Sequence, residues 1–236
     1  MFQNFAHRSY RLERLDTGDY TPAEYAKWQI EMRYINRLLG DSRALRLSLA
    51  EDLRDSGGSG VSILDIGAGS GELLKTAKES IGNEHTFLVG VELNASAAKS
   101  INDRYDELGV FAVQCDAMKL PFADNSFDYV VSSLFLHHFD DDQAANLIDE
   151  MNRVARKRFF VIDLHRSAAA FYLYRTLGSI FLQRFTVEDG SLSILRSFRP
   201  AELRALAVKA GVRDAVVKRR AAFRLVLSGT KAVQRA

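Results

Sequence analysis

The stretch Val61–Glu72, which reads VSILDIGAGSGE, constrains this chain more than any other. Apolar residues at positions 61, 63, 64 and 66 form a short β-type run, and three glycines at alternate positions follow it. Glycine permits a tight turn and leaves main-chain N–H groups without a Cβ shield, so a ligand can approach them closely. A helix-like segment comes next. Strand, glycine turn and helix together predict a nucleotide-type pocket at the carboxyl edge of a sheet.

The spacing of the glycines separates two classes of cofactor. The dinucleotide fingerprint G-x-G-x-x-G requires glycine at position 72, where this chain has Glu72, so an NAD-dependent oxidoreductase is disfavoured. The pattern here is D-x-G-x-G-x-G, formed by Asp65, Gly67, Gly69 and Gly71. It resembles motif I of the class I S-adenosylmethionine-dependent methyltransferases, including the acidic residue two positions before the first glycine.

Composition narrows the class of protein further. A chain of 236 residues with 47% hydrophobic and 26% charged residues is typical of a globular domain. Its net charge of +2 gives no support for nucleic-acid binding, and its single cysteine, Cys115, excludes an internal disulfide. We expect a cytoplasmic protein, because neither a signal peptide nor a transmembrane segment is recognisable. Basic runs at 153–158 and 218–220 leave a weak peripheral membrane contact open.

Strand and helix patterns alternate after the glycine turn and indicate parallel βαβ units. Strands are predicted at 61–66, 86–91, 110–115, 127–132 and 158–162, followed by 212–218 and 222–228. The last two are joined by a very short turn and must be antiparallel. The expected α/β fold is a Rossmann-like, doubly wound seven-stranded sheet, mostly parallel with an antiparallel C-terminal hairpin. Over residues 59–229 this order resembles the class I methyltransferase sheet.

Helical segments are expected outside this sheet. A capping box at Thr21–Glu24, with proline at the first helical position, begins an amphipathic helix that ends near Gly40, and a second helix covers about 42–53. The run Ser56–Gly60 is a flexible linker. We predict an N-terminal helical cap at 1–57 and a methyltransferase domain at 58–236, with a helical lid inserted at 166–198. Residues 1–20 carry no clear secondary-structure signal.

Acidic residues stand at the ends of the second and third predicted strands. Glu92 can accept both hydrogen bonds of a ribose diol, although in isolation it would be an ordinary loop acid. The resemblance implies that Asp116 contacts the adenine amino group and that Asp65 orients the methionine moiety. We therefore predict S-adenosyl-L-methionine as cofactor and S-adenosyl-L-homocysteine as product. The predicted cofactor-binding residues are Asp65, Gly67, Ala68, Gly69, Gly71, Glu92, Leu93, Asp116, Ala117 and Ser132.

Histidines follow two predicted strands, where a general base for methyl transfer belongs. His137 and His138 come after strand four and His165 after strand five, and we predict that at least one contacts the acceptor. A packing or capping role is the alternative for each, above all for His138 beside Phe139. We expect no metal, since the acids that accompany a histidine in a metal-using ubiquinone O-methyltransferase group are replaced here by Leu134 and His137.

The acceptor is the least constrained part of the prediction. The segment Leu120–Phe139 resembles the stretch around strand four of ubiquinone/menaquinone-type methyltransferases, and residues 171–185 predict an aromatic helix. That helix is either a lid for a hydrophobic acceptor or a buried or dimer-forming element. We predict in-line O- or C-methylation of a small hydrophobic or aromatic molecule (quinone-like, phenolic or polyketide-type) by a monomer or homodimer. An RNA or protein methyltransferase and a non-catalytic cofactor-binding subunit are the alternatives.

Overall fold

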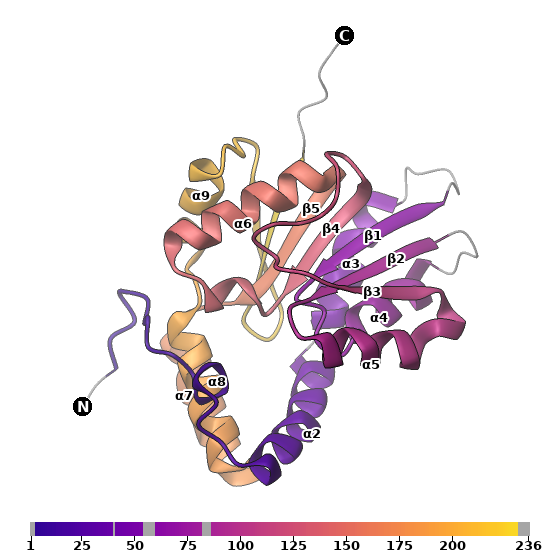
Figure 1. The fold of residues 1–236 in the computed structure, drawn as a ribbon. Coiled ribbons are helices and arrows are strands. Elements are labelled where there is room, and N and C mark those ends of the chain that lie inside the picture. The colour runs from indigo at the N-terminus through magenta and orange to yellow at the C-terminus, as the bar shows by residue number, and fades with distance from the viewer. Residues whose placement is uncertain (1–2, 40, 54–59, 82–85, 231–236) are drawn as a thin grey trace.

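The computed structural model, which describes residues 3–39, 41–53, 60–81 and 86–230, has a twisted seven-stranded sheet at its centre (Figure 1). Strands β1 to β5 are parallel, and β7 lies antiparallel between β5 and β6. The predicted fold class is therefore confirmed. Across the sheet the strands are β3 (Val110–Gln114), β2 (Thr86–Glu92), β1 (Val61–Ile66), β4 (Phe127–Ser133), β5 (Ala155–Leu164), β7 (Arg224–Thr230) and β6 (Val216–Arg220).

Most strand limits agree with the hydrophobic pattern within two residues, and two do not. The β5 strand begins at Ala155, earlier than predicted, because Ala155 pairs with Phe127 ahead of a register shift. The β6 strand begins only at Val216, because the chain first turns away from the preceding helix at Gly211, whose φ is +76°. Central β1 and β4 are buried on both faces, as expected of parallel strands covered by helices.

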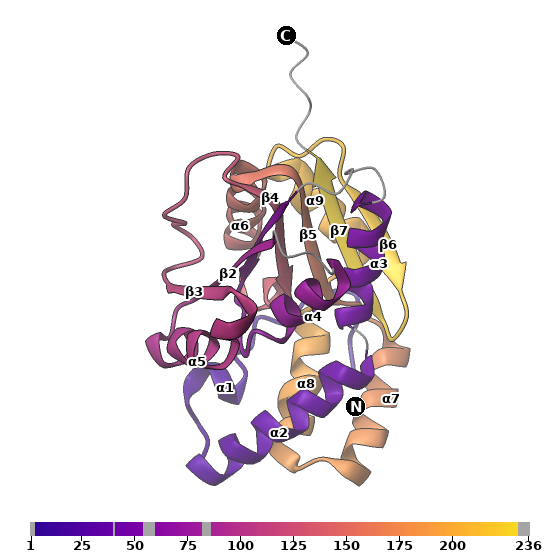
Figure 2. The same ribbon diagram turned by 90° about the vertical axis from the view of Figure 1, so that its right-hand side faces the viewer.

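Helices cover both faces of the sheet (Figures 1 and 2). On one face, α3 (Asp41–Leu53), α4 (Glu72–Ile81) and α5 (Ala95–Tyr105) enclose one hydrophobic core; on the other, α6 (Asp141–Val154) and α9 (Pro200–Lys209) enclose a second. The α3 helix contributes Leu45 and Leu49 to the first core and so packs on the sheet layer. The division at residue 57 stays a prediction, and most of the predicted linker lies outside the described residues.

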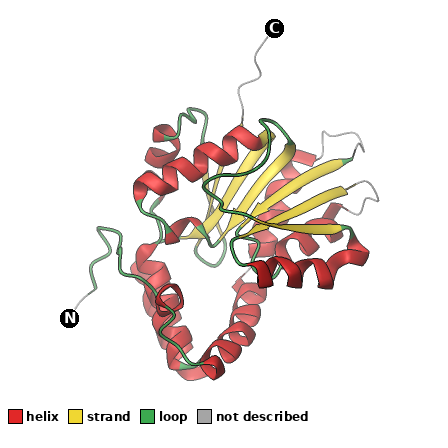
Figure 3. Cartoon of the chain, viewed as in Figure 1, coloured by secondary structure: helices red, strands yellow, loops and turns green. Residues whose placement is uncertain are grey.

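A second helical layer lies beyond the carboxyl edge of the sheet (Figures 1 and 3). It comprises α1 (Arg14–Thr17), α2 (Pro22–Leu39), α7 (Ala168–Phe181) and α8 (Arg184–Arg196). The insertion is thus a helical hairpin, and the single aromatic helix predicted through Phe185 is wrong. The chain becomes extended at Leu182, and the backbone N–H of Gln183 donates to Glu31 Oε1 of α2 at 3.0 Å. This contact comes from a distant helix, so no local glycine or proline marks the break.

The first described residues form an extended arm, residues 3–13, that crosses α8 (Figure 1). The N–H of Ser9 donates to Leu195 O at 2.9 Å, and Arg8 Nε donates to Arg196 O at 2.7 Å. The buried guanidinium of Arg166, just after β5, donates to Phe5 O at 3.1 Å. These contacts hold the arm beside the ends of β4 and β5. Among the described helices, none is long and apolar enough to span a bilayer.

Candidate active site

The glycine turn after β1 leaves its main chain accessible at one position. All three glycines have positive φ: +70° at Gly67, +57° at Gly69 and +77° at Gly71. A Cβ at Gly67 would lie 2.7 Å from the ring of Phe135, and one at Gly71 would lie 2.8 Å from the ring of Tyr105. At Gly69, no described atom lies within 4 Å of the Cβ position. A ligand can therefore approach the backbone at Gly69, whereas the other two glycines permit close packing.

Two carboxylates converge on this turn. Asp65 is buried, and its Oδ1 has no hydrogen-bond partner among the described residues. Glu92, at the end of β2, accepts a hydrogen bond from Gly69 N–H. Burial, reinforced by the negative charge of Glu92, raises the pKa of Asp65 well above its usual range, and burial also raises the pKa of Glu92. An unpartnered buried oxygen beside a second carboxylate favours a cationic ligand and opposes an anionic one such as a pyrophosphate.

The other predicted cofactor residues follow the ends of β1 to β4, but several already have structural contacts. Asp116 Oδ1 accepts from Met118 N–H at 2.9 Å, which fixes the turn after β3. Ser132 Oγ donates to Ile66 O at 3.0 Å and ties β4 to β1. Leu93 is 72% exposed beside Glu92, whereas Ala68 and Ala117 are buried. Their roles in binding the cofactor stay predictions.

His137, in the short 3-10 helix η2 (Leu136–His138), is buried against a carboxylate of the next strand. Its Nδ1 lies 2.7 Å from Asp163 Oδ1, and its backbone N–H donates to Asp163 Oδ2 at 3.0 Å. Burial raises the pKa of Asp163, but the charge and hydrogen bonds of His137 outweigh it and leave that pKa below its usual value. Whenever the ring is uncharged, this contact places its proton on Nδ1, facing Asp163, and leaves the lone pair on Nε2.

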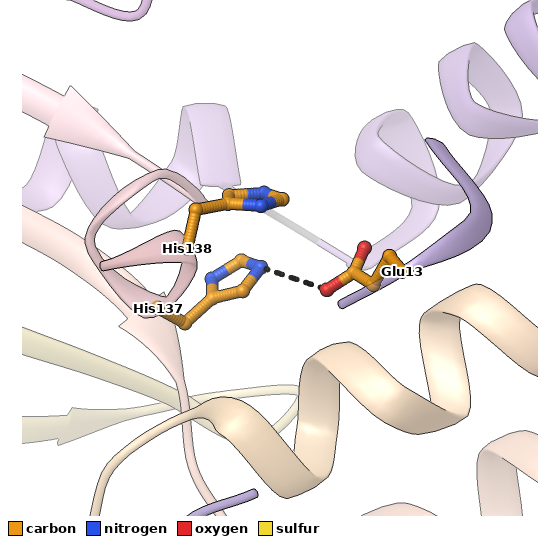
Figure 4. A group of neighbouring side chains, drawn as sticks. All are labelled: Glu13, His137 and His138. Atoms are coloured by element: carbon orange, nitrogen blue, oxygen red, sulfur yellow. Dashed lines mark ion pairs between the residues drawn. The ribbon is translucent and has the colours of Figure 1, made fainter. Parts of the chain in front are cut away.

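The arm places a carboxylate in front of that nitrogen (Figure 4). Glu13 Oε1 lies 4.0 Å from His137 Nε2, and burial raises the pKa of Glu13 to about 7. Asp16 Oδ1 lies 3.1 Å from His138 Nδ1. Arg196 of α8 joins these groups, because its Nη2 donates to His138 O at 2.8 Å and its Nη1 contacts both Asp16 and Glu13. Arm, α8 and η2 thus form one polar cluster.

A pocket of about 180 Å³ adjoins this cluster. Its lining combines both histidines with aromatic and aliphatic side chains of the arm and of the loop after β4. The lining residues are Ser9, Tyr10, Leu12, His137, His138, Phe139, Asp140, Gln143 and Arg196. The predicted lid aromatics are absent from this lining: Phe171 is buried in the helical hairpin, and Phe181 is 77% exposed. The arm and α8 border the pocket instead.

His165 has different surroundings. Its backbone N–H donates to Phe223 O at 2.8 Å, and it forms an isolated bridge with Phe198. Burial, followed by the positive charges of Arg219, Arg199 and Arg166, lowers its pKa. These contacts are with the β6–β7 hairpin and the start of α9, so the structure groups His137 with His138 and leaves His165 outside the cluster.

Sequence reasoning missed four members of the cluster: Asp163, Glu13, Asp16 and Arg196. Asp163 carried a usable signal, because it follows the predicted strand 158–162 directly, as Glu92 follows the predicted strand 86–91. Glu13 and Asp16 carried none, because they lie at the end of an arm without periodicity and in the four-residue helix that follows it. Arg196 carried none, because it lies on a helix that was expected to form a lid.

This sheet order, with a glycine turn after β1 and an acid at the end of β2, defines a class I S-adenosylmethionine-dependent methyltransferase fold. Residues 63–158 match the family described as "Methyltransferase domain". Residues 63–158 thus match a methyltransferase domain, and S-adenosylmethionine is the cofactor of the class that this fold defines. The chemistry at the glycine turn agrees, because the unpartnered oxygen of Asp65 and the carboxylate of Glu92 suit a cofactor that carries an ammonium and a sulfonium group.

Comparisons with known proteins agree with this assignment. The "Ubiquinone/menaquinone biosynthesis C-methyltransferase UbiE" of Xanthomonas campestris is 38% identical over 98 residues, or 40% of this chain, and that of Xylella fastidiosa strain M23 is 37% identical over 102 residues. These segments span only 38% and 39% of the relatives' own lengths.

Solved structures resemble the fold at low identity. A SAM-dependent methyltransferase from Aquifex aeolicus superposes with a TM-score of 0.59 at 16% identity, covering 83% of this chain and 92% of its own. The CurJ carbon methyltransferase gives a TM-score of 0.68 at 10% identity, covering 92% and 62%. Magnesium protoporphyrin IX methyltransferase from Synechocystis, solved with bound S-adenosylhomocysteine, gives 0.58 at 14% identity, covering 82% and 84%.

Proposed function

We propose that the protein methylates a small hydrophobic or aromatic acceptor with an ionisable hydroxyl group, using S-adenosylmethionine. The observation that carries this proposal is the buried His137–Asp163 pair in the segment that follows β4. Phe135 connects the two sites, because its ring packs on Gly67 and it lies two residues before His137. The bound cofactor supplies an electrophilic methyl group. The protein supplies alignment of the acceptor, exclusion of water and removal of a proton.

His137 is the residue to which we assign proton removal. Asp163 holds the ring by Nδ1, so Nε2 is left to accept the proton of the acceptor hydroxyl, and the carboxylate stabilises the resulting imidazolium. A general base of this kind contributes about 10²–10⁴-fold to a rate. The assignment serves O-methylation of a phenol and equally C-methylation of a ring activated by its phenolate.

The pocket supports a ring-sized acceptor. A cavity of about 150 Å³ is large enough for benzene, and this pocket measures about 180 Å³. Tyr10, Leu12 and Phe139 give it apolar walls, while the histidines give it a polar end. The relatives named for ubiquinone/menaquinone biosynthesis support a quinone-like acceptor.

Two measurements test this function. Isothermal titration is expected to show binding of S-adenosylhomocysteine and none of NAD, and radiolabelled methyl transfer is expected to a hydroquinone or phenol panel but not to RNA or protein. Replacing His137 with Gln is expected to lower kcat about 10²-fold or more, with little change in the affinity for S-adenosylhomocysteine. The control variant His7→Asn, at an exposed position of the arm, is expected to keep wild-type activity. The proposal would be refuted if the protein did not bind S-adenosylhomocysteine, or if it transferred methyl groups to RNA or protein alone.

A further inference from the structure

We propose that Glu13, His137 and His138 form a site for one divalent transition-metal ion. One ligand atom from each of these residues lies within 4.8 Å of the others. Two imidazoles and one carboxylate form a donor set typical of zinc and non-haem iron, and not of magnesium or calcium, which take oxygen ligands. The residues come from two elements far apart in sequence, the arm and η2, which meet at the carboxyl edge of the sheet (Figure 4).

Both histidines are already oriented as metal ligands. A ligating histidine nearly always donates its second ring nitrogen to a carboxylate or carbonyl, which fixes its tautomer and raises its basicity. His137 Nδ1 contacts Asp163 at 2.7 Å and His138 Nδ1 contacts Asp16 at 3.1 Å. Each ring is thus held at Nδ1 and keeps Nε2 for an ion. Asp163 and Asp16 would thus support the two histidine ligands from outside the coordination sphere of the ion.

The third ligand lacks a hydrogen bond where the ion would lie. Glu13 Oε1 is buried without a hydrogen-bond partner among the described residues, and it lies 4.0 Å from His137 Nε2. Ligands about 2.1 Å from a tetrahedral ion lie about 3.4 Å apart, so the cluster would contract slightly on binding. Side-chain rotation of the half-buried His138 and of Glu13 can provide this contraction. Its ion pair with Arg196 Nη1 is long, at 3.7 Å, so a metal ion would give this carboxylate oxygen a closer partner.

The charge around the cluster also favours a dication. The carboxylates of the cluster and its surroundings are Glu13, Asp16, Asp163 and Asp141, the last through its ion pair with Arg8, and the guanidinium groups are Arg8 and Arg196. Four acids against two bases leave two negative charges when all are ionised, which one divalent ion neutralises. The pocket lined by His137 and His138 provides an entry path and space for a further ligand.

Metal loading would change the role of His137, a consequence that rests on the proposed function. Three protein ligands leave a coordination position open, as in catalytic sites. An acceptor hydroxyl bound there would lose its proton to water in the adjoining pocket more readily, because coordination lowers the pKa of the hydroxyl. His137 then acts as a ligand, and in the metal-free protein it acts as the base. The two roles exclude each other, so loading decides which one operates.

Cobalt titration of the full chain, after treatment with a chelator, tests the site directly. We expect visible ligand-field absorption that saturates at one equivalent of Co²⁺, is abolished by Zn²⁺ and is unaffected by Mg²⁺. Glu13→Gln and, in a separate protein, His138→Asn are expected to weaken binding at least tenfold, and Asp163→Asn about 10–100-fold through the outer shell. His7→Asn, in the same arm and exposed, is the matched control and keeps wild-type affinity.

The second variant protects the test against misfolding, because His138 is only half buried whereas Glu13 is buried. Absence of saturable Co²⁺ absorption would overturn the metal site, and so would unchanged affinity in both folded variants. Binding of S-adenosylhomocysteine, measured on the same samples, separates this outcome from failure of the proposed function. If the protein binds S-adenosylhomocysteine but not cobalt, the metal site alone is refuted.

Discussion

Asp163 holds His137 at two points: one carboxylate oxygen contacts the ring Nδ1 at 2.7 Å, and the other accepts the backbone N–H at 3.0 Å. The acid is the penultimate residue of β5 and the histidine follows β4, so a single side chain fixes ring and backbone across two neighbouring strands. The orientation of the imidazole is therefore set by the sheet before any acceptor binds.

Replacing Asp163 with Asn keeps the shape of the side chain but is expected to change which ring nitrogen of His137 carries the proton. The amide would donate to Nδ1, which moves the ring proton to Nε2 and removes the lone pair that accepts the acceptor proton. In chelator-treated protein we expect kcat to fall by about 10²-fold or more, as for loss of a general base, with unchanged affinity for S-adenosylhomocysteine. Steady-state kinetics and calorimetry measure the two effects. Equal losses of both would indicate a structural role.

Asp65→Asn is expected to separate stability from cofactor affinity. The raised pKa of Asp65 means that the folded protein holds its proton more tightly than the unfolded chain does. Stability therefore declines as the pH rises above the ordinary pKa of 3.8, so that the buried carboxyl group of Asp65 lowers the stability of the cofactor-free fold at neutral pH. The amide has no proton to lose as the pH rises, so Tm at pH 7–8 should increase.

The same substitution is expected to weaken cofactor binding. Loss of a charge-assisted hydrogen bond costs about 1.5–3 kcal/mol, which corresponds to about 10–100-fold in Kd. Thermal melts across pH and titration calorimetry provide the comparison. If Asp65→Asn has a lower Tm at neutral pH and binds S-adenosylhomocysteine with wild-type affinity, both expectations are wrong.

Asp128 is expected to stabilise the fold against acid. Burial raises its pKa, but hydrogen bonds from Ser62 and the charge of Lys157 outweigh that effect and lower it. Its contribution is therefore complete above the ordinary pKa of 3.8 and is lost as the pH falls through the lowered value. Asp128→Asn should cost about 1–3 kcal/mol at neutral pH. Urea unfolding at neutral and acidic pH should show that the difference in free energy of unfolding between the wild type and the variant becomes smaller in acid. A difference that does not change with pH would argue against this role of Asp128.

The sheet was predictable because its signals are local. Apolar runs, strand-end acids and the glycine turn each occupy a few neighbouring residues, and the parallel order follows from their alternation with helices. The same rule extends to Asp163 at the end of β5. Glu13 and Asp16 were not predictable, because they lie in and beside a four-residue helix and gain their surroundings from η2 and α8. The break at Leu182 likewise depends on Glu31, more than 100 residues earlier.

Gly67 and Gly69 form a matched pair that separates packing from cofactor approach. Alanine at either position is strained, because both have positive φ, at a cost of about 1 kcal/mol. Gly67→Ala also forces a methyl group to 2.7 Å from the Phe135 ring, and overpacking adds about 1–3 kcal/mol. At Gly69 the space is open among the described residues, so stability is expected to fall less there.

Affinity for S-adenosylhomocysteine should follow the opposite order in stability-corrected measurements. The Gly69→Ala methyl group projects into the open space from which a ligand reaches the backbone, so it should obstruct the cofactor directly. The Gly67→Ala methyl group acts through Phe135 and should also lower kcat, since that ring leads into η2 and His137. Thermal unfolding, calorimetry and kinetics on the two variants decide the matter. If Gly69→Ala loses more stability than Gly67→Ala and binds S-adenosylhomocysteine with wild-type affinity, the open face of the turn is not the cofactor site.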